Sequence, residues 1–195
     1  MSYPLVKPRR LTVAEFREIE LNAPEEERWE LLDGYIVKSM AGGTKIHNLI
    51  VFNIQSALMN ALRRKGSPCR AFSENVRLDI DPSLASTLPD VVVSCSPWAG
   101  SPTSISDAAA IVEVLSPSTA FVDLGAKLDA YLTLDSLRTC LFVEQKKRAV
   151  IVHRKTNDGW LRQDLSSPTD RVAFDGLDVS MTLAEIYEDV TFDAA

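Results

Sequence analysis

The chain has 195 residues, of which 46% are hydrophobic and 25% are charged, and its formal net charge is −6. This length and composition are typical of one globular domain with a full core, so we expect a single domain over residues 1–195. No apolar stretch of the sequence approaches the roughly 20 residues needed to span a bilayer. The acidic balance argues against a basic protein that coats nucleic acid.

The N-terminus carries basic residues without an apolar segment behind them, so we do not expect a signal peptide. The three cysteines (Cys69, Cys95 and Cys140) are widely spaced and match no zinc-binding pattern. We interpret them as small buried hydrophobic residues. This usage favours a reducing compartment, and we expect a cytoplasmic protein.

The first half of the chain contains clear start and stop signals for secondary structure. Thr12 and Glu15 form a capping box that begins a helix. Asp33-Gly34 is a hairpin turn between two strands, and Gly66 ends a long helix with a wide apolar stripe. The predicted elements are a helix over 12–22, strands over 29–32 and 35–37, a helix over 44–65, and strands over 70–73, 76–80 and 90–95.

The second half continues the alternation of strands and helices. Residues 96–107 are rich in Ser, Pro and Gly and predict a loop, and a second capping box at Thr182 predicts a last helix. The other predicted elements are a strand over 109–115, a helix over 120–134, and strands over 140–144, 149–154, 160–165 and 171–174. This order indicates an α/β or α+β fold, with a mixed central β-sheet flanked by helices.

A carboxylate stands within one of these apolar strands. Residues 108–115 read as a fully buried strand that contains Glu113. An unpaired buried carboxylate costs several kcal/mol or stays protonated, so we expect a cation, a metal or hydrogen bonds beside it. Asp90, which follows Pro89, opens a second apolar strand. Two acids on two hydrophobic strands can form one metal site.

Two further charged residues complete a candidate site. Glu30 lies on the first hairpin, and Lys127 lies on the helix that follows the Glu113 strand. Two or three carboxylates suit a hard divalent cation such as Mg²⁺, which polarises a phosphate and lowers the pKa of a bound water. A nearby lysine can orient that water or stabilise the transition state. The residues alone leave open an ordinary surface pair between Lys127 and Asp123, and a simple turn at Asp90.

Several motifs occur together in this chain: Trp29-Glu30-Leu31-Leu32-Asp33-Gly34-Tyr35-Ile36-Val37, His47, Pro89-Asp90, Ile111-Val112-Glu113-Val114-Leu115-Ser116-Pro117-Ser118-Thr119, then Asp123, Gly125, Lys127, Leu128, Tyr131 and Asp158-Gly159-Trp160. In this combination the chain resembles the putative restriction endonuclease family, a bacterial group within the PD-(D/E)XK nuclease superfamily. The resemblance spans about residues 10–190.

The resemblance implies a restriction-endonuclease-like fold and a metal-dependent nuclease site. By position, Asp90 and Glu113 become the two main ligands of Mg²⁺ or Mn²⁺, and Glu30 becomes an added acidic ligand. The usual superfamily lysine, two residues after the second acid, is here Leu115. Members of the family take the lysine from the following helix, where this chain has Lys127.

Two functions from different classes follow. The first is a metal-dependent endonuclease that hydrolyses DNA phosphodiester bonds, with Asp90, Glu113, Lys127 and Glu30 as catalytic residues. The second is a non-catalytic, dimeric binding or regulatory module on a nuclease-like scaffold. In either case we expect a homodimer. His47 matches the family pattern, but the residues before it lack the expected prolines, so no role is assigned to it.

Overall fold

The computed structural model describes residues 9–40, 42–73, 75–81, 84–97, 103–116 and 123–192. The helices are α1 (Val13–Glu20), α2 (Lys45–Arg64), the π-helical segment η1 (Asp123–Lys127), α4 (Leu128–Tyr131) and α5 (Leu183–Ile186). The strands are β1 (Glu27–Leu32), β2 (Tyr35–Met40), β3 (Arg70–Ser73), β4 (Arg77–Asp81), β5 (Ala85–Thr87), β6 (Val91–Ser94), β7 (Ser104–Ile105), β8 (Ala108–Leu115), β9 (Thr139–Glu144), β10 (Val150–Thr156), β11 (Gly159–Leu165), β12 (Arg171–Phe174) and β13 (Val179–Thr182).

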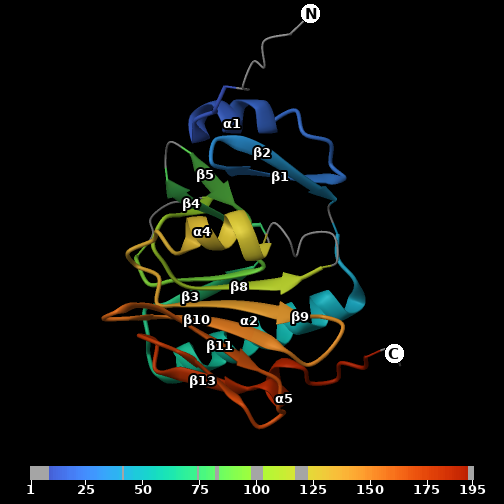
Figure 1. The fold of residues 1–195 in the computed structure, drawn as a ribbon, viewed down its shortest axis with the longest axis vertical. Helices are drawn as coiled ribbons and strands as arrows, with labels where there is room; N and C mark the ends of the chain where they lie inside the picture. The colour runs from blue at the N-terminus through green and yellow to red at the C-terminus, as the bar shows by residue number, and fades with distance from the viewer. Residues whose placement is uncertain are drawn as a thin grey trace, which may run out of the picture.

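The larger sheet has six strands in the order β11-β10-β9-β8-β6-β3. It is mixed, because β8 and β9 run parallel while the other neighbours run antiparallel. Strand β8 lies between β9 and β6 and is buried on both faces, which explains its nearly continuous apolar sequence. One face of this sheet packs on α2, and the other faces α4 and the second sheet (Figure 1).

The second sheet has five strands in the order β2-β1-β5-β4-β7 and lies toward the N-terminal end of the molecule (Figure 1). Its first two strands form a hairpin that turns at Asp33 and Gly34, both of which have positive φ angles. Gly34 has a φ of 77°, and a Cβ there would lie 2.6 Å from Cβ of Arg10. The turn therefore needs glycine for both its conformation and its close contact. Helix α1 covers this sheet through the buried ring of Phe16.

Helix α2 is the main cover of the larger sheet. Thr44 caps its N-terminus by accepting a hydrogen bond from the backbone N–H of His47 at 3.0 Å. Its buried side chains recur at helical spacing and form one apolar face: Ile50, Val51, Ile54, Leu58 and Leu62. No helix within the described residues is both long and apolar enough to cross a membrane.

The predicted fold class is confirmed, because mixed sheets are flanked by helices. The strands divide, however, among two mixed sheets and a two-stranded antiparallel sheet of β12 and β13, and do not form one central sheet. The predicted loop over 96–107 contains the short strand β7. The short strand β5, between the predicted strands over 76–80 and 90–95, and β13, before the last helix, were not predicted. The predicted helix over 120–134 begins outside the described residues, and its visible part is the π-helical η1 followed by the single turn of α4.

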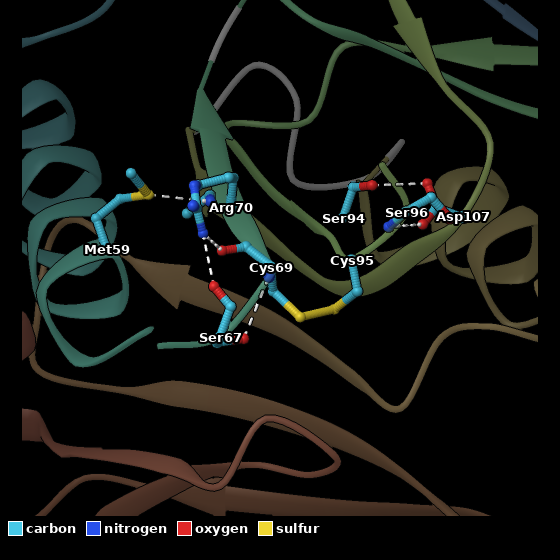
Figure 2. Close-up of a disulfide and its surroundings, with 9 residues drawn as sticks. Met59, Ser67, Cys69, Arg70, Ser94, Cys95, Ser96 and Asp107 are labelled. Atoms are coloured by element: carbon cyan, nitrogen blue, oxygen red, sulfur yellow. Dashed lines mark hydrogen bonds between the residues drawn. A yellow bond between two sulfur atoms is a disulfide. The ribbon is translucent and has the colours of Figure 1, made fainter. Parts of the chain in front are cut away.

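The interpretation of all three cysteines as buried thiols is wrong for two of them. Cys69 and Cys95 form a disulfide (Figure 2). Cys140 is a free buried thiol, as predicted. The reason is the antiparallel register of β3 and β6, in which Arg70 pairs with Ser94. Cys69, just before Arg70, therefore lies opposite Cys95, just after Ser94. Cysteine usage thus gives no support for a reducing compartment.

Candidate active site

The structure places Asp90 and Glu113 side by side. Strands β6 and β8 are antiparallel neighbours in which Val91 pairs with Val112, so the residues at positions 90 and 113 are opposite each other on one face. Oδ2 of Asp90 accepts a hydrogen bond from the backbone N–H of Val114 at 2.7 Å. This bond fixes the carboxylate of Asp90 against the end of β8. Both acids are buried, with exposed fractions of 7% and 3%.

Glu113 meets both a cation and a hydroxyl group. Its Oε1 lies 3.2 Å from Nζ of Lys127 and accepts a short hydrogen bond from the hydroxyl group of Tyr131. Burial raises the pKa of Glu113 well above its ordinary value of 4.5. Lys127 opposes this shift, and the nearby carboxylates of Asp90, Asp123 and Glu30 add to it.

Lys127 is the centre of a buried acidic cluster. Its ammonium lies 3.1 Å from Oε2 of Glu30, 3.2 Å from Oε1 of Glu113 and 3.2 Å from Oδ1 of Asp123. Burial alone would lower the pKa of Lys127, but the three carboxylates raise it well above its ordinary value. Lys127 therefore stays a cation in the folded protein.

The position of Lys127 depends on the π-helical winding of η1. In a regular helix, Leu124 and Leu128 would share an apolar face with Lys127 at its flank. The structure instead buries Asp123 and Lys127 and leaves Leu124 38% exposed. A π-helical turn has a different residue period and is frequent at functional sites. The predicted pair of Asp123 and Lys127 thus forms, but within the core and not on the surface.

Glu30 reaches this cluster from the other sheet. It lies on β1 and is 6% exposed, and its Oε1 accepts a hydrogen bond from the backbone N–H of Leu88 at 2.7 Å. Asp90 and Glu113 come from the larger sheet, so the cluster lies where the two sheets and η1 meet (Figure 1). Water has little access to this place, and charges there interact strongly.

His47 lies beside the acid pair. It is in the first turn of α2, and its Nε2 is 3.3 Å from Oδ2 of Asp90. The same end of α2 is tied to the large sheet through Gln145, whose Oε1 accepts a hydrogen bond from Oγ1 of Thr44 at 2.7 Å. Nε2 of Gln145 in turn donates to the carbonyl oxygen of Leu115 at 2.9 Å. The helix start is thereby held against the strand that carries Glu113.

Sequence reasoning missed the part played by Tyr131. The sequence assigns it no role beyond the family motif, and its ring is fully buried in the core between the sheets. Its hydroxyl group also contacts Glu113 and lies 3.3 Å from Oγ1 of Thr87. The signal in the sequence was its spacing, four residues after Lys127, which places both residues on one helical face.

The donor set suits a divalent cation. Three of the four buried carboxylates (Glu30, Glu113 and Asp123) contact the one buried ammonium, and Asp90 lies beside Glu113, so the cluster is rich in acidic groups that a hard cation would balance. Within the described ranges, no group of three or more His, Cys, Asp and Glu side chains already has a metal-ligating arrangement. Nζ of Lys127 occupies the space between Glu30, Glu113 and Asp123. A metal ion would therefore bind on the other side of Glu113, between Glu113 and Asp90.

The architecture and this acidic site define a protein of the restriction-endonuclease-like class. The fold matches a crystal structure described as a putative nuclease belonging to DUF820 from Anabaena variabilis ATCC 29413. The TM-score is 0.72 at 19% identity, and the match covers 91% of this chain and 97% of that chain. At this identity the likeness concerns the fold. Residues 13–184 match the family model Uma2, described as "Putative restriction endonuclease", and the chain belongs to this family.

Two curated relatives come from Synechocystis sp. (strain ATCC 27184 / PCC 6803 / Kazusa). "Uncharacterized protein slr1290" is 30% identical over 170 residues, which is 86% of this chain and 87% of that protein. "Uncharacterized protein sll1609" is 29% identical over 168 residues, which is 84% of this chain and 92% of that protein. Both likenesses extend over most of the domain and are not confined to the site.

Proposed function

We propose that the protein is a metal-dependent endonuclease that hydrolyses phosphodiester bonds of DNA. The observation that carries the proposal is the register that puts Asp90, just before β6, beside Glu113 of the neighbouring β8, with the Lys127 ammonium 3.2 Å from Glu113. Two carboxylates and one lysine in a buried site are the groups that a metal-dependent hydrolase of phosphodiesters needs. The family description and the printed title of the structural relative support nuclease activity.

In this proposal each charged residue has a separate task. Asp90 and Glu113 would hold Mg²⁺ or Mn²⁺, with Glu30 as an added acid. When bound, the cation would polarise the phosphate and lower the pKa of a water molecule. Lys127 would orient the attacking water and stabilise negative charge in the transition state. Its raised pKa keeps it protonated, which favours the electrostatic role over that of a general base.

Three neighbours would position these groups without touching the substrate. Tyr131 fixes Oε1 of Glu113, and Asp123 holds the Lys127 ammonium. His47 lies against Asp90 and would orient its carboxylate. The homodimeric state and a cytoplasmic location, where DNA is accessible, are further parts of the proposal.

A second candidate is a non-catalytic, dimeric binding or regulatory module on the same scaffold. The observation in its favour is that Lys127 contacts three carboxylates and lies 6% exposed, as a purely structural ion cluster would. Leu115, at the position of the usual superfamily lysine, is buried among apolar side chains and gives the site no charge. On this reading the acids stabilise the junction between the two sheets.

Cleavage of supercoiled plasmid DNA with Mg²⁺ or Mn²⁺ separates the two candidates. We expect cleavage by the purified wild type, and its loss in Asp90→Asn and in Asp90→Ala. Asp79→Asn is the matched control, because Asp79 is a partly buried acid that pairs with Arg17 away from the site. Absence of cleavage by a folded wild type with either metal would favour the binding module. Equal cleavage by the Asp90 variants would reject the assigned metal site.

A further inference from the structure

Strand β11 ends the larger sheet with an open edge. In the part of the chain that the structure describes, β11 pairs with β10 alone. Residues 161–164 are exposed on both faces of the strand. A long exposed edge offers unpaired backbone groups to another strand, and proteins normally cover or shorten such edges. We therefore expect this edge either to pair with another strand or to carry features that prevent such pairing.

The register of the hairpin identifies which backbone groups point outward. Thr156 pairs with Gly159 across a two-residue turn, and the backbone N–H of Lys155 donates to the carbonyl oxygen of Arg138, away from β11. Hydrogen-bonded and non-hydrogen-bonded pairs alternate in an antiparallel ladder. The N–H and C=O groups of Arg162 and Asp164 therefore point away from β10, toward the open edge.

Charge selects one antiparallel register for a second copy of this strand. With Gln163 opposite itself, Arg162 lies opposite the partner's Asp164, and Asp164 lies opposite the partner's Arg162. The two-fold axis can also lie one residue away, at position 162 or 164, and the same outward-pointing N–H and C=O groups still pair. With the axis at 162, Arg162 lies opposite the partner's Arg162. With the axis at 164, Asp164 lies opposite the partner's Asp164. Opposite charges across strands stabilise a pair and like charges destabilise it. The edge is thus self-complementary in one register.

The apolar residues of the strand agree with this register. Leu161 is 53% exposed, whereas Leu165 on the same face is buried in the core. The register centred on Gln163 places Leu161 opposite the partner's Leu165, at the border of the partner's core. After Leu165 the chain turns away, because the N–H groups of Ser166 and Ser167 donate to Oδ2 of Asp170. The edge that pairs therefore has defined ends.

We propose that two copies of this chain dimerise through β11, as antiparallel strands centred on Gln163, which makes one sheet continuous across both subunits. The interface is isologous, as most homodimer interfaces are. The inference specifies the homodimer put forward under Proposed function and is independent of nuclease activity. Its test measures mass and not cleavage, so the failure of one proposal does not imply the failure of the other.

The test uses charge reversals of the full-length protein in sedimentation velocity at low ionic strength. Arg162→Asp alone places two acids opposite two acids, and Asp164→Arg alone places two arginines opposite two arginines. We expect each variant to dimerise at least tenfold more weakly than the wild type. The decisive sample is a 1:1 mixture of the two variants, in which every opposed pair again has opposite charges. We expect that mixture, and the double variant R162D/D164R, to regain dimers.

A matched control reverses a similar ion pair elsewhere. Arg10 and Asp33 form an exposed pair at 2.7 Å, much like the 2.9 Å pair of Arg162 and Asp164. Arg10→Asp should leave the dimer unchanged. The inference is overturned by a wild type that stays monomeric at all concentrations. It is equally overturned by a dimer that tolerates both β11 reversals, or by a 1:1 mixture that stays monomeric.

Discussion

Replacing Lys127 by methionine removes the only positive charge that the buried carboxylates Glu30, Glu113 and Asp123 contact among the described residues. Methionine keeps most of the volume, so the variant tests charge and not packing. Breaking a buried ion pair by removing one partner costs about 3–5 kcal/mol. For a domain of this size, such a loss lowers the unfolding midpoint by roughly 6–20 °C.

The loss of stability in Lys127→Met should be larger at high pH than at low pH. Lys127 is the neighbour that lowers the pKa of Glu113, so its removal raises that pKa still further above the ordinary value of 4.5. A folded state that favours the protonated carboxyl loses stability as pH rises above 4.5. Lys127→Met should therefore be closer to the wild type at pH 5 than at pH 8.

Urea unfolding followed by circular dichroism at the two pH values measures this effect. Lys65→Met is the control, because Lys65 and Asp178 form an exposed pair, for which we expect a change of about 0–1 kcal/mol. Equal stability of Lys127→Met and Lys65→Met at both pH values would refute the electrostatic reasoning. It would also favour the ordinary surface pair between Lys127 and Asp123 that the residues alone leave open.

Three further changes test other contacts. Glu113→Gln mimics the protonated carboxyl, so without metal we expect its stability relative to the wild type to increase as pH rises above 4.5, in urea unfolding; a relative stability that falls with pH would contradict the raised pKa. Tyr131→Phe keeps the ring and removes the hydrogen bond to Glu113, so unfolding should show a loss of about 0.5–1.5 kcal/mol, and no loss would contradict the contact. Replacing Cys69 and Cys95 by serine opens a loop with a sequence separation of 26 and should lower stability by about 3.5 kcal/mol in the chain-entropy model. Dithiothreitol should lower the melting temperature of the wild type and leave the double serine variant unchanged, and equal melting of all samples would argue against the disulfide.

The proximity of Asp90 and Glu113 could be predicted from the sequence, because both acids stand in apolar runs that are typical of buried strands. Asp90 and Glu113 stand in apolar runs where a charge needs a partner, and pairing of β6 with β8 brings them together. The helix starts at Thr12 and Thr182 were equally predictable, because a capping box is a local signal. Local chemistry decided each of these features.

The features that sequence reasoning missed depend on tertiary structure. The π-helical winding of η1 buries Asp123 and Lys127, and the regular helical spacing of Leu124 and Leu128 gives no signal of it. The disulfide depends on the register of β3 against β6, which no spacing of Cys69 and Cys95 reveals. The spacing of residues along the sequence reveals neither the winding of η1 nor the register of β3 against β6.

The central claim is that Asp90 and Glu113 together hold a divalent cation for phosphodiester hydrolysis. Its most direct test is anomalous diffraction from crystals of the protein grown with Mn²⁺, with Asp90→Asn crystals treated in the same way as the control. The account predicts one Mn²⁺ peak within about 2.0–2.5 Å of carboxylate oxygens of both Asp90 and Glu113 in the wild type, and no such peak in the variant. A wild-type crystal without Mn²⁺ between these two residues, or with the same peak in Asp90→Asn, would contradict it.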